Sequence, residues 1–241
     1  MKKPEAASGK DGFIKSLKDA KITTKREAAM FLAQVWHESG GLQYTKEIIC
    51  QENVEQCKKA YPAEKEGKDT GKVYYGRGYI QLTWDYNYAA ASKDLFGDDR
   101  LIKDPEQVGT DLELAWRTAA WFWGKNVHPD PGVQEGKFGA STKKINGGLE
   151  CEPFKDNPDC TKEAFLKSRM RFQYYTTIMK AIGETGELDE SGCYAKPTNT
   201  IEECEKIAKG GAAAPAASGA APASSAAPAS SAGPAATTAA K

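Results

Sequence analysis

Apolar residues recur with the 3.6-residue period of an amphipathic helix over several long stretches of this chain. The pattern predicts helices at 12–20, 24–39, 87–95, 110–123 and 161–182. The alternation typical of strands is weak, and its best candidate is the short run 79–82. We therefore expect a mainly helical (α+β) domain with a minor β element and long ordered loops.

Two of these helices begin with the same capping signal. Thr24 is followed three residues later by Glu27, as in a capping box, where both side chains satisfy free backbone N–H groups. Thr110 and Glu113 repeat this spacing before the helix at 110–123. Glycine is expected to end the helices, because it adopts the left-handed C-cap conformation without strain. The glycines in question are Gly40, Gly41, Gly97, Gly124 and Gly183.

The two ends of the chain differ in composition from the rest. From Gly210 onward the sequence is almost entirely Ala, Pro, Ser, Gly and Thr, with Lys241 as the only charge. Such a segment cannot bury enough apolar surface to offset the entropy of ordering it, and an O-glycosylated stalk and an inert linker both fit its composition. We expect a flexible N-terminus at 1–10, one globular domain at 11–209 and a disordered tail at 210–241.

The charge of the chain is balanced, with 33 basic and 33 acidic residues. No long-range field attracts it to nucleic acid or an anionic membrane, so a neutral polymer is the more natural partner and a monomer is expected. No run of about 18 apolar residues predicts a membrane span. The first residues lack the apolar core of a signal peptide, so a secreted protein would be present here in trimmed or recombinant form.

The cysteine pattern points to an oxidising compartment. There are six cysteines without a C-x-x-C pair, and His37 and His128 are the only histidines, which argues against zinc or another metal cofactor. Three disulfides are the favoured account, which implies a secreted or cell-surface protein, and six buried thiols are the alternative. The cysteines are Cys50, Cys57, Cys151, Cys160, Cys193 and Cys204.

Two glutamates on either side of a glycine turn suggest acid–base chemistry. Glu38 lies at the margin of the apolar face at the end of its helix, where burial and the helix dipole raise the pKa of a carboxyl group, as a general acid requires. Glu47 follows in a loop, where a carboxylate near water stays ionised and can act as a base. The alternatives are a glutamate at a frayed helix end and an ordinary solvated surface.

A segment rich in tyrosine and glycine follows at 74–83. Its spaced glycines lack the strand and the motif of a phosphate loop, so we interpret it as a turn that directs Gln81, Thr83 and Asn87 toward a polar substrate. Tyr75 is a candidate to stack on a sugar ring, although most of the neighbouring aromatic residues suit the core better.

Five motifs follow one another in order along the chain. They are His-Glu-Ser-Gly-Gly at 37–41, Tyr-Tyr-Gly-Arg-Gly-x-Ile-Gln-Leu-Thr at 74–83, Asn-Tyr at 87–88, Trp-Phe-Trp at 121–123 and Ile-Asn-Gly-Gly-Leu-Glu-Cys at 145–151. Together, over roughly residues 24–175, they resemble the family 19 glycoside hydrolases, the plant-type chitinases. This resemblance implies a bilobal, mostly helical, lysozyme-like fold with a cleft, and inverting hydrolysis of β-1,4-linked N-acetylglucosamine polymers.

The resemblance also implies roles for individual residues. Glu38 would be the general acid, Glu47 the general base, and Thr83 would help to hold the attacking water in place of the family's usual serine. The resemblance places Gln81, Asn87 and Asn146 in the sugar subsites, with Arg169 supporting the acidic pair. It further implies the disulfides Cys50–Cys57 and Cys151–Cys193, which leaves Cys160 with Cys204.

Three functions remain open at this point. The first is an endochitinase acting on chitin or chitooligosaccharides. The second is a muramidase acting on peptidoglycan, and the third is a chitin-binding protein without turnover. The two retained carboxylates disfavour the third, and the absence of a basic excess disfavours binding to an anionic cell wall.

Overall fold

The computed structural model describes residues 6–61, 71–156, 158–194 and 199–211, and this part of the chain is helical without a regular strand. Residues 212–241, which make up nearly all of the expected tail, and residues 1–5 lie outside it. The elements in order are α1 (Ala6–Asp19), α2 (Lys25–Glu38), α3 (Ile48–Glu52), α4 (Val54–Ala60), α5 (Asp85–Phe96), α6 (Arg100–Lys103), α7 (Gln107–Thr110), α8 (Leu112–Phe122), the π-helix η1 (Trp123–Val127), α9 (Pro131–Gln134), α10 (Phe138–Glu150), the 3₁₀ turn η2 (Glu152–Phe154), α11 (Glu163–Ala181) and α12 (Ile201–Gly211).

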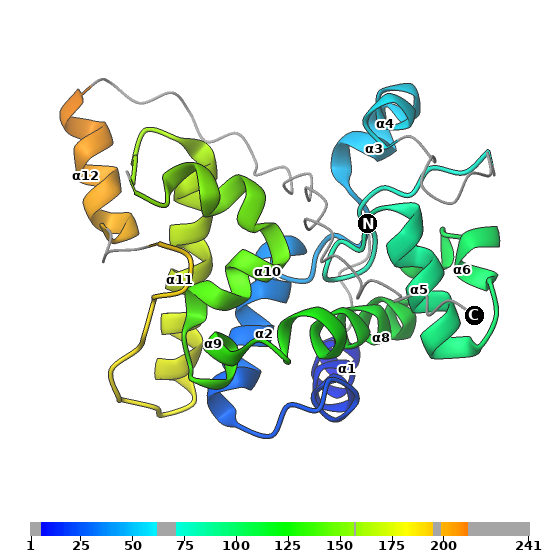
Figure 1. Cartoon of the computed structure of the whole chain (residues 1–241), viewed down its shortest axis with the longest axis horizontal. Coiled ribbons are helices and arrows are strands. Elements are labelled where there is room, and N and C mark those ends of the chain that lie inside the picture. Colours follow the sequence, from blue (N-terminus) through cyan, green and yellow to red (C-terminus); the bar gives the residue numbers. More distant parts are fainter. Residues whose placement is uncertain (1–5, 62–70, 157, 195–198, 212–241) are drawn as a thin grey trace, which may run out of the picture.

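Helix α2 occupies the centre of the molecule (Figure 1). It packs mainly against α11 and also against α10, while α8 packs against α1. Its apolar side includes Phe31 and Val35, both fully buried, and the Phe31 ring meets the ring of Trp123 edge-on at 5.3 Å between centroids. This packing fixes the C-terminal end of α2, and with it Glu38, inside the protein.

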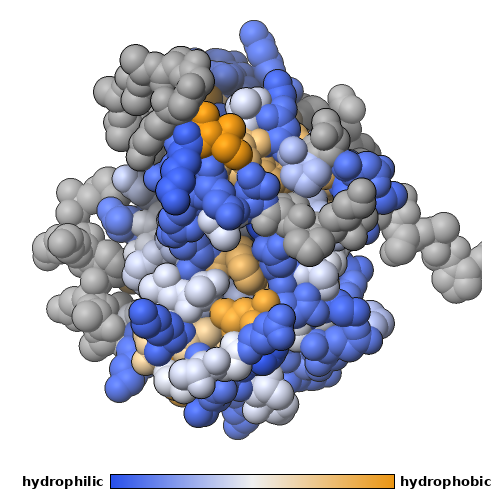
Figure 2. Space-filling model, turned by 90° about the vertical axis from the view of Figure 1, so that its left-hand side faces the viewer, coloured by the Kyte–Doolittle hydropathy of each residue, from blue (hydrophilic) through white to orange (hydrophobic). Residues whose placement is uncertain are grey.

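One face of the molecule is largely polar. The face seen in Figure 2 is mostly hydrophilic, with apolar residues in small separate patches. Leu149 and Ile182 are exposed apolar residues of the described part of the chain, and single residues of this kind are common on protein surfaces. No helix in the described ranges is both long and apolar enough to cross a membrane.

The helix starts were predicted with partial success. The Thr24 hydroxyl caps α2 by accepting from the Glu27 N–H at 3.1 Å, which confirms half of the capping box. The Glu27 side chain does not complete the box, because its Oε1 atom instead accepts from Trp123 Nε1 at 2.9 Å and lies 2.7 Å from His128 Nδ1. Helix α1 begins at Ala6, earlier than the start expected at residue 12.

The limits of α8 were predicted wrongly at both ends. Asp111, not Thr110, caps the helix, and its Oδ1 atom accepts from the N–H groups of Glu113 and Leu114. Gly124 does not end the helix, which continues as η1. An added Cβ at Gly124 would lie 3.4 Å from the Ala20 Cα atom, so this glycine permits close packing of the α1–α2 connection. The glycine signal therefore reports tertiary packing rather than a helix end.

The expected strand at 79–82 is a turn. Arg77 and Leu82 exchange two backbone hydrogen bonds of 3.1 and 2.7 Å and form only an isolated bridge. Between them Gly78 and Gln81 adopt left-handed φ angles of 72° and 54°. By contrast, α5 ends at Gly97 in the left-handed conformation, as predicted.

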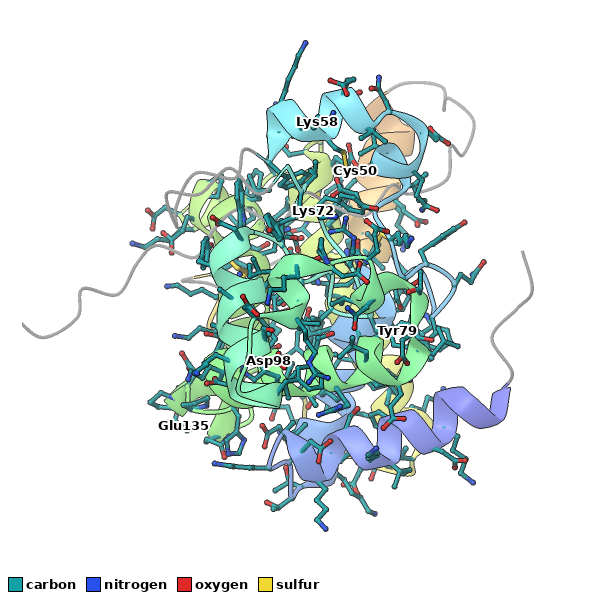
Figure 3. The ribbon with its side chains drawn as sticks, turned by 90° about the vertical axis from the view of Figure 1, so that its right-hand side faces the viewer. Cys50, Lys58, Lys72, Tyr79, Asp98 and Glu135 are labelled. Carbon is teal, nitrogen blue, oxygen red and sulfur yellow. A yellow bond between two sulfur atoms is a disulfide. The ribbon has the colours of Figure 1, made fainter. Side chains whose placement is uncertain are left out.

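The three expected disulfides are confirmed as Cys50–Cys57, Cys151–Cys193 and Cys160–Cys204. The alternative of buried thiols is therefore excluded. The first disulfide joins α3 to α4, which Figure 3 marks at one end of the molecule by Cys50 and Lys58. The other two connect the segment after α10 to the chain beyond α11, so they hold this helix pair together from outside.

Candidate active site

A buried cluster of charges lies where α2, α10 and α11 meet. Arg171 Nη2 lies 2.5 Å from Glu38 Oε1, and Arg171 also binds both carboxylate oxygens of Glu150, with Nε–Oε2 at 2.7 Å and Nη2–Oε1 at 2.8 Å. All three side chains are buried, and Glu38 is only 3 % exposed. Buried charges are stable in this form because each is paired and hydrogen-bonded.

Gln34 holds the arginine from the other side. It lies one helical turn before Glu38 on the same face of α2, and its Oε1 atom accepts from Arg171 Nη1 at 2.9 Å. Its Nε2 atom donates to the hydroxyls of Ser141 and Thr142, both at 2.9 Å. The guanidinium group is therefore fixed in the plane that meets both carboxylates.

The environment of Glu38 makes its carboxyl group a weaker acid than a glutamate in water. Burial raises the pKa of the Glu38 carboxyl group above its usual value, and the nearby Arg171 cation opposes this shift only in part. The raised pKa of Glu38 was predicted from the sequence, and burial is its main cause. Burial likewise lowers the pKa of His37, which keeps this neighbouring imidazole neutral.

The arginine expected to support Glu38 requires a correction. Arg169 does not contact this carboxylate in the structure and instead pairs with Glu190, with Nη1 and Oε2 2.7 Å apart. The partner of Glu38 is Arg171, which lies three residues after Ser168 and four before Tyr175 on the buried stripe of α11. This helical spacing was the signal that could have identified Arg171.

Glu150 was also missed in the sequence, where only Asn146 was singled out from the segment 145–151. Helix α10 continues through this segment but is kinked at Asn146, where φ is −142°. The kink lets Asn146 Nδ2 donate to Glu150 Oε1 at 2.7 Å. Its buried Oδ1 atom has no hydrogen-bond partner among the described residues, which leaves an acceptor available to a ligand.

Glu47 belongs to a second cluster. It precedes α3 and is tied to the glycine turn, since its N–H donates to the Gly76 carbonyl at 2.9 Å. Its carboxylate accepts from the Tyr61 hydroxyl at 3.0 Å and from the Gly76 N–H at 3.4 Å. These bonds hold the carboxylate in one orientation beside the turn.

The prediction that Glu47 is a loop carboxylate near water was wrong. The side chain is buried, with Glu47 only 5 % exposed. Burial raises the pKa of Glu47, while hydrogen bonds from Tyr61 and Gly76 oppose the rise. The disulfide between α3 and α4 brings Tyr61 over this carboxylate, a long-range contact with no local sequence signal.

Arg77 is the structural centre of the glycine turn. Its guanidinium group donates to the Val73 carbonyl at 2.9 Å and to the Tyr88 hydroxyl at 3.1 Å, and forms an ion pair with Glu106. It also lies 3.5 Å from the centroid of the Tyr75 ring. Tyr75, which was predicted to stack on a sugar ring, is only 9 % exposed. Arg77 occupies one face of its ring.

The remaining predicted substrate residues follow this turn and are connected to one another. Gln81 donates to the Gly78 carbonyl, Thr83 to the Gln81 carbonyl and Asn87 to the Thr83 carbonyl, at 2.8 to 2.9 Å. Gly76 touches both Glu47 and Gln81, since a Cβ at this position would lie 2.8 Å from Gln81 Oε1. The turn therefore positions Glu47, Gln81 and Thr83 as one unit.

The described residues contain no group of three or more metal-ligating side chains. Both clusters instead consist of carboxylates, amides and hydroxyls with one arginine each, Arg171 in the first and Arg77 in the second. These groups can donate a proton, accept a proton and hydrogen-bond a neutral polar ligand.

Comparison with known proteins assigns the chain to a family. The family model described as "Chitinase class I" matches residues 5–137, which is more than half of the chain. The chain belongs to this family, glycoside hydrolase family 19. The predicted membership is thereby confirmed, and the matched region contains Glu38, Glu47 and the glycine turn.

Related proteins agree with this family. The chain is 42 % identical over 161 residues to an endochitinase of Arabidopsis thaliana, which covers 67 % of this chain and 50 % of that protein. It is 37 % identical over 166 residues to Endochitinase EP3 of the same plant, covering 66 % and 52 %. The chain thus spans about half the length of the curated relatives it matches.

Solved structures show the same fold. Chitinase C from Streptomyces griseus superimposes with a TM-score of 0.60 at 29 % identity, covering 76 % of this chain and 72 % of that one. The class IV family 19 chitinase from Zea mays gives 0.55 at 28 % identity, covering 78 % and 89 %. The mainly helical, lysozyme-like fold of family 19 is therefore confirmed for this chain.

Proposed function

We propose that this protein is an endo-acting chitinase that hydrolyses β-1,4-linked N-acetylglucosamine polymers with inversion. The observation that carries the proposal is the pair of buried glutamates, Glu38 and Glu47, each held by a different set of partners and each with a raised pKa. An inverting glycosidase requires two carboxyl groups, one that donates a proton and one that activates a water molecule.

The roles follow from the different surroundings. Glu38 lies next to a second carboxylate, Glu150, and burial is the dominant influence on it, which favours the protonated form of a general acid. Glu47 accepts hydrogen bonds from Tyr61 and Gly76, which favour the ionised form of a general base.

The proposed reaction uses these two groups on opposite faces of the sugar. Glu38 donates its proton to the glycosidic oxygen as the bond to the anomeric carbon breaks. Glu47 takes a proton from a water molecule, and the water oxygen attacks the same carbon from the other face. The Thr83 hydroxyl donates to the Gln81 carbonyl, so its oxygen remains able to accept a hydrogen bond from that water.

The remaining residues would bind the substrate. We assign Gln81, Asn87 and Asn146 to the sugar subsites, since each carries an amide that can bond hydroxyl or acetamido groups. The free Oδ1 acceptor of Asn146 supports its assignment. The three disulfides support a location in the secretory pathway or outside the cell.

Product analysis tests this proposal. The wild-type protein and Glu38→Gln are each incubated with chitin hexamer and with peptidoglycan, and the products are identified by mass spectrometry. We expect the wild type to shorten the chitin hexamer and Glu38→Gln to leave it intact. Release from peptidoglycan alone would show a muramidase, and binding of the hexamer without any cleavage would show a lectin-like protein.

The Tyr61 hydroxyl should set the acid limb of the pH profile. Its hydrogen bond lowers the pKa of Glu47, so Tyr61→Phe should raise that pKa and move the acid limb of kcat/KM to higher pH. The sign follows because the base must be ionised, and a higher pKa leaves less of it ionised at a given acidic pH. Loss of a hydrogen bond to a charged group, roughly 1.5 kcal/mol, should lower the rate up to roughly tenfold below the optimum.

The matched control is Tyr44→Phe, because Tyr44 makes no contact with Glu47 among those of the described residues. Its pH profile should overlay that of the wild type. An unchanged acid limb in Tyr61→Phe would contradict the role of Glu47 as the base.

A further inference from the structure

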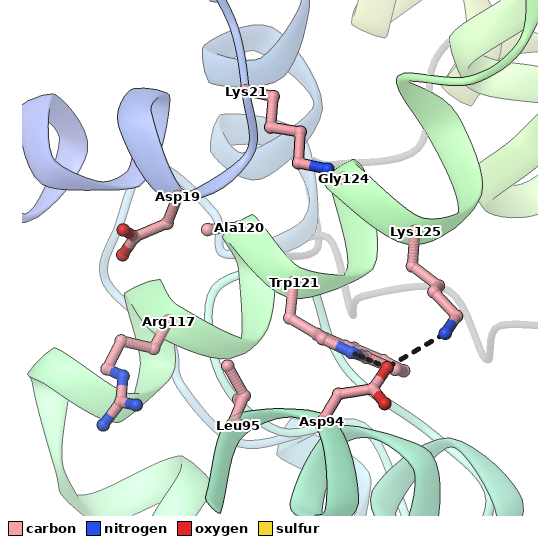
Figure 4. Close-up of a pocket in the computed structure, with 9 residues that line it drawn as sticks. All are labelled: Asp19, Lys21, Asp94, Leu95, Arg117, Ala120, Trp121, Gly124 and Lys125. Carbon is pink, nitrogen blue, oxygen red and sulfur yellow. Dashed lines mark hydrogen bonds and ion pairs between the residues drawn. The ribbon is translucent and has the colours of Figure 1, made fainter.

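A second concave site lies away from the two carboxylate clusters, between the end of α1, helix α5 and the junction of α8 with η1 (Figure 4). It is an open pocket of about 380 Å³, a size typical of small-ligand sites. Ala120 and Gly124 are among the residues that line it, and Trp121 is its aromatic lining residue. None of the residues assigned to the active site lines it.

The indole ring of Trp121 is held in place. Its Nε1 atom donates to Asp94 Oδ2 at 2.9 Å, and Lys125 Nζ lies 3.0 Å from the same oxygen. These bonds, first that of Trp121 and then that of Lys125, lower the pKa of Asp94, so the anchor stays ionised. A ring that is already fixed loses little conformational entropy when a ligand stacks on it.

Free polar groups line the same pocket. Asp19 and Lys21 make no side-chain hydrogen bond or ion pair within the described residues. Arg117 lies with its guanidinium carbon 4.7 Å from the Phe96 ring centroid and forms no ion pair or side-chain hydrogen bond within the described residues. The pocket therefore offers an unpaired acceptor and several unpaired donors.

Two of these residues are unfavourable for the fold. Asp19 is the last residue of α1, where the negative end of the helix dipole disfavours a carboxylate. Lys21 has a φ of 62°, a left-handed conformation that glycine adopts more easily. Residues that oppose stability and converge on one pocket indicate a binding role.

We propose that this pocket binds one sugar unit of a chitin chain, at a site separate from the carboxylate clusters. The apolar C–H face of a pyranose fits the Trp121 ring. Its hydroxyls, which both donate and accept, fit the mixture of Asp19 with Lys21 and Arg117. Because both signs of charge line the pocket, a neutral sugar fits better than an anion. The choice of chitin rests on the proposed function.

Such a site would act by tethering. A polymer bound at the pocket stays at a high local concentration near the active site, so even a weak second contact increases retention on insoluble chitin. A shallow pocket for one sugar should bind with a dissociation constant on the order of 1 mM.

Nuclear magnetic resonance of the tryptophan indole N–H groups tests the proposal. Chitotetraose is titrated into full-length Glu38→Gln, in which the ligand should survive, and the Trp121 signal is identified by its loss in Trp121→Phe. We expect the Trp121 signal to shift with chitotetraose and not with inorganic phosphate. A shift with phosphate alone would mean an anion site and overturn the proposal, as would an unmoved Trp121 signal while other indole signals shift.

Adsorption to insoluble chitin provides the second measurement. Trp121→Ala should weaken adsorption at least fivefold, about the value of one aromatic contact, and Trp121→Phe should retain most of it. Asp19→Asn should weaken adsorption while raising the melting temperature, which a purely structural role would not do. Ile182→Ala, at another exposed position, is the control and should adsorb like the wild type.

These results separate the second site from the proposed function. Cleavage of chitin hexamer by the wild type, with adsorption unchanged in Trp121→Ala and Asp19→Asn, would refute the second site alone. Absence of cleavage by the wild type would refute the proposed function. If Trp121→Ala does not fold, Asp19→Asn and Lys21→Gln still decide, because both lie at exposed positions.

Discussion

Replacing Glu38 by glutamine should reduce the hydrolysis of chitin hexamer by a factor on the order of 10² or more. The amide has the size of the protonated carboxyl group and can still bond Arg171, but it cannot deliver a proton to the glycosidic oxygen. Binding should persist, so the loss should lie in kcat rather than in KM. Steady-state kinetics on chitin hexamer, with binding measured by calorimetry, provides the test.

The control for this variant is Glu52→Gln, at an exposed glutamate of α3. It removes one negative charge near the same region and should retain the wild-type rate. Turnover by Glu38→Gln within a few-fold of the wild type would remove Glu38 from the role of general acid.

Replacing Arg171 by methionine should lower the free energy of unfolding by about 3–5 kcal/mol, because it leaves the buried carboxylates of Glu38 and Glu150 without their cation. Without Arg171, which lowers it, the pKa of Glu38 should rise further. When the pKa of Glu38 is higher in the folded than in the unfolded protein, its contribution to stability is fully present below the unfolded-state pKa. This contribution is lost as the pH rises through the folded-state pKa. The destabilisation should therefore be greater at neutral pH than in acid, as urea unfolding at several pH values would show.

Two further variants make this prediction specific. Arg171→Lys keeps the charge but cannot bond both carboxylates and Gln34 at once, so it should recover only part of the stability. The alkaline limb of the activity profile follows the pKa of Glu38, because the general acid must be protonated. Arg169→Met also removes a buried arginine, yet it should leave this limb unchanged, because the partner of Arg169 is Glu190. An alkaline limb that shifts in Arg169→Met and not in Arg171→Met would show that Arg169, and not Arg171, controls Glu38.

Local signals in the sequence predicted much of the helical fold. The Thr24 cap and the Gly97 end depend on backbone groups within a few residues, so the sequence alone specifies them. The limits of α8 were mispredicted for the opposite reason. Gly124 is required by the approach of Ala20, a contact between segments about one hundred residues apart. A glycine that is needed for close packing therefore cannot be distinguished in the sequence from a glycine that ends a helix.

In the candidate site too, features that depend on neighbouring residues were predicted, and features that depend on distant contacts were not. The raised pKa of Glu38 followed from its place on the helix face. The burial of Glu47 did not, since it depends on Tyr61 being carried over it by α4. The family resemblance implied that Arg169 supports the acidic pair. The arginine that pairs with Glu38 is Arg171, two residues later on the buried side of α11.

The anomeric form of the first products tests the central claim most directly, namely that Glu38 and Glu47 act as acid and base across the bond that breaks. An inverting pair needs carboxyl groups roughly 6.5–9.5 Å apart, with room for water between them. Proton nuclear magnetic resonance during the first minutes of chitin hexamer cleavage would resolve the new reducing ends. The account predicts that the α-anomer appears first and that the β-anomer grows in afterwards by mutarotation. Initial release of the β-anomer would mean retention of configuration and would contradict the role of Glu47 as a base acting on water.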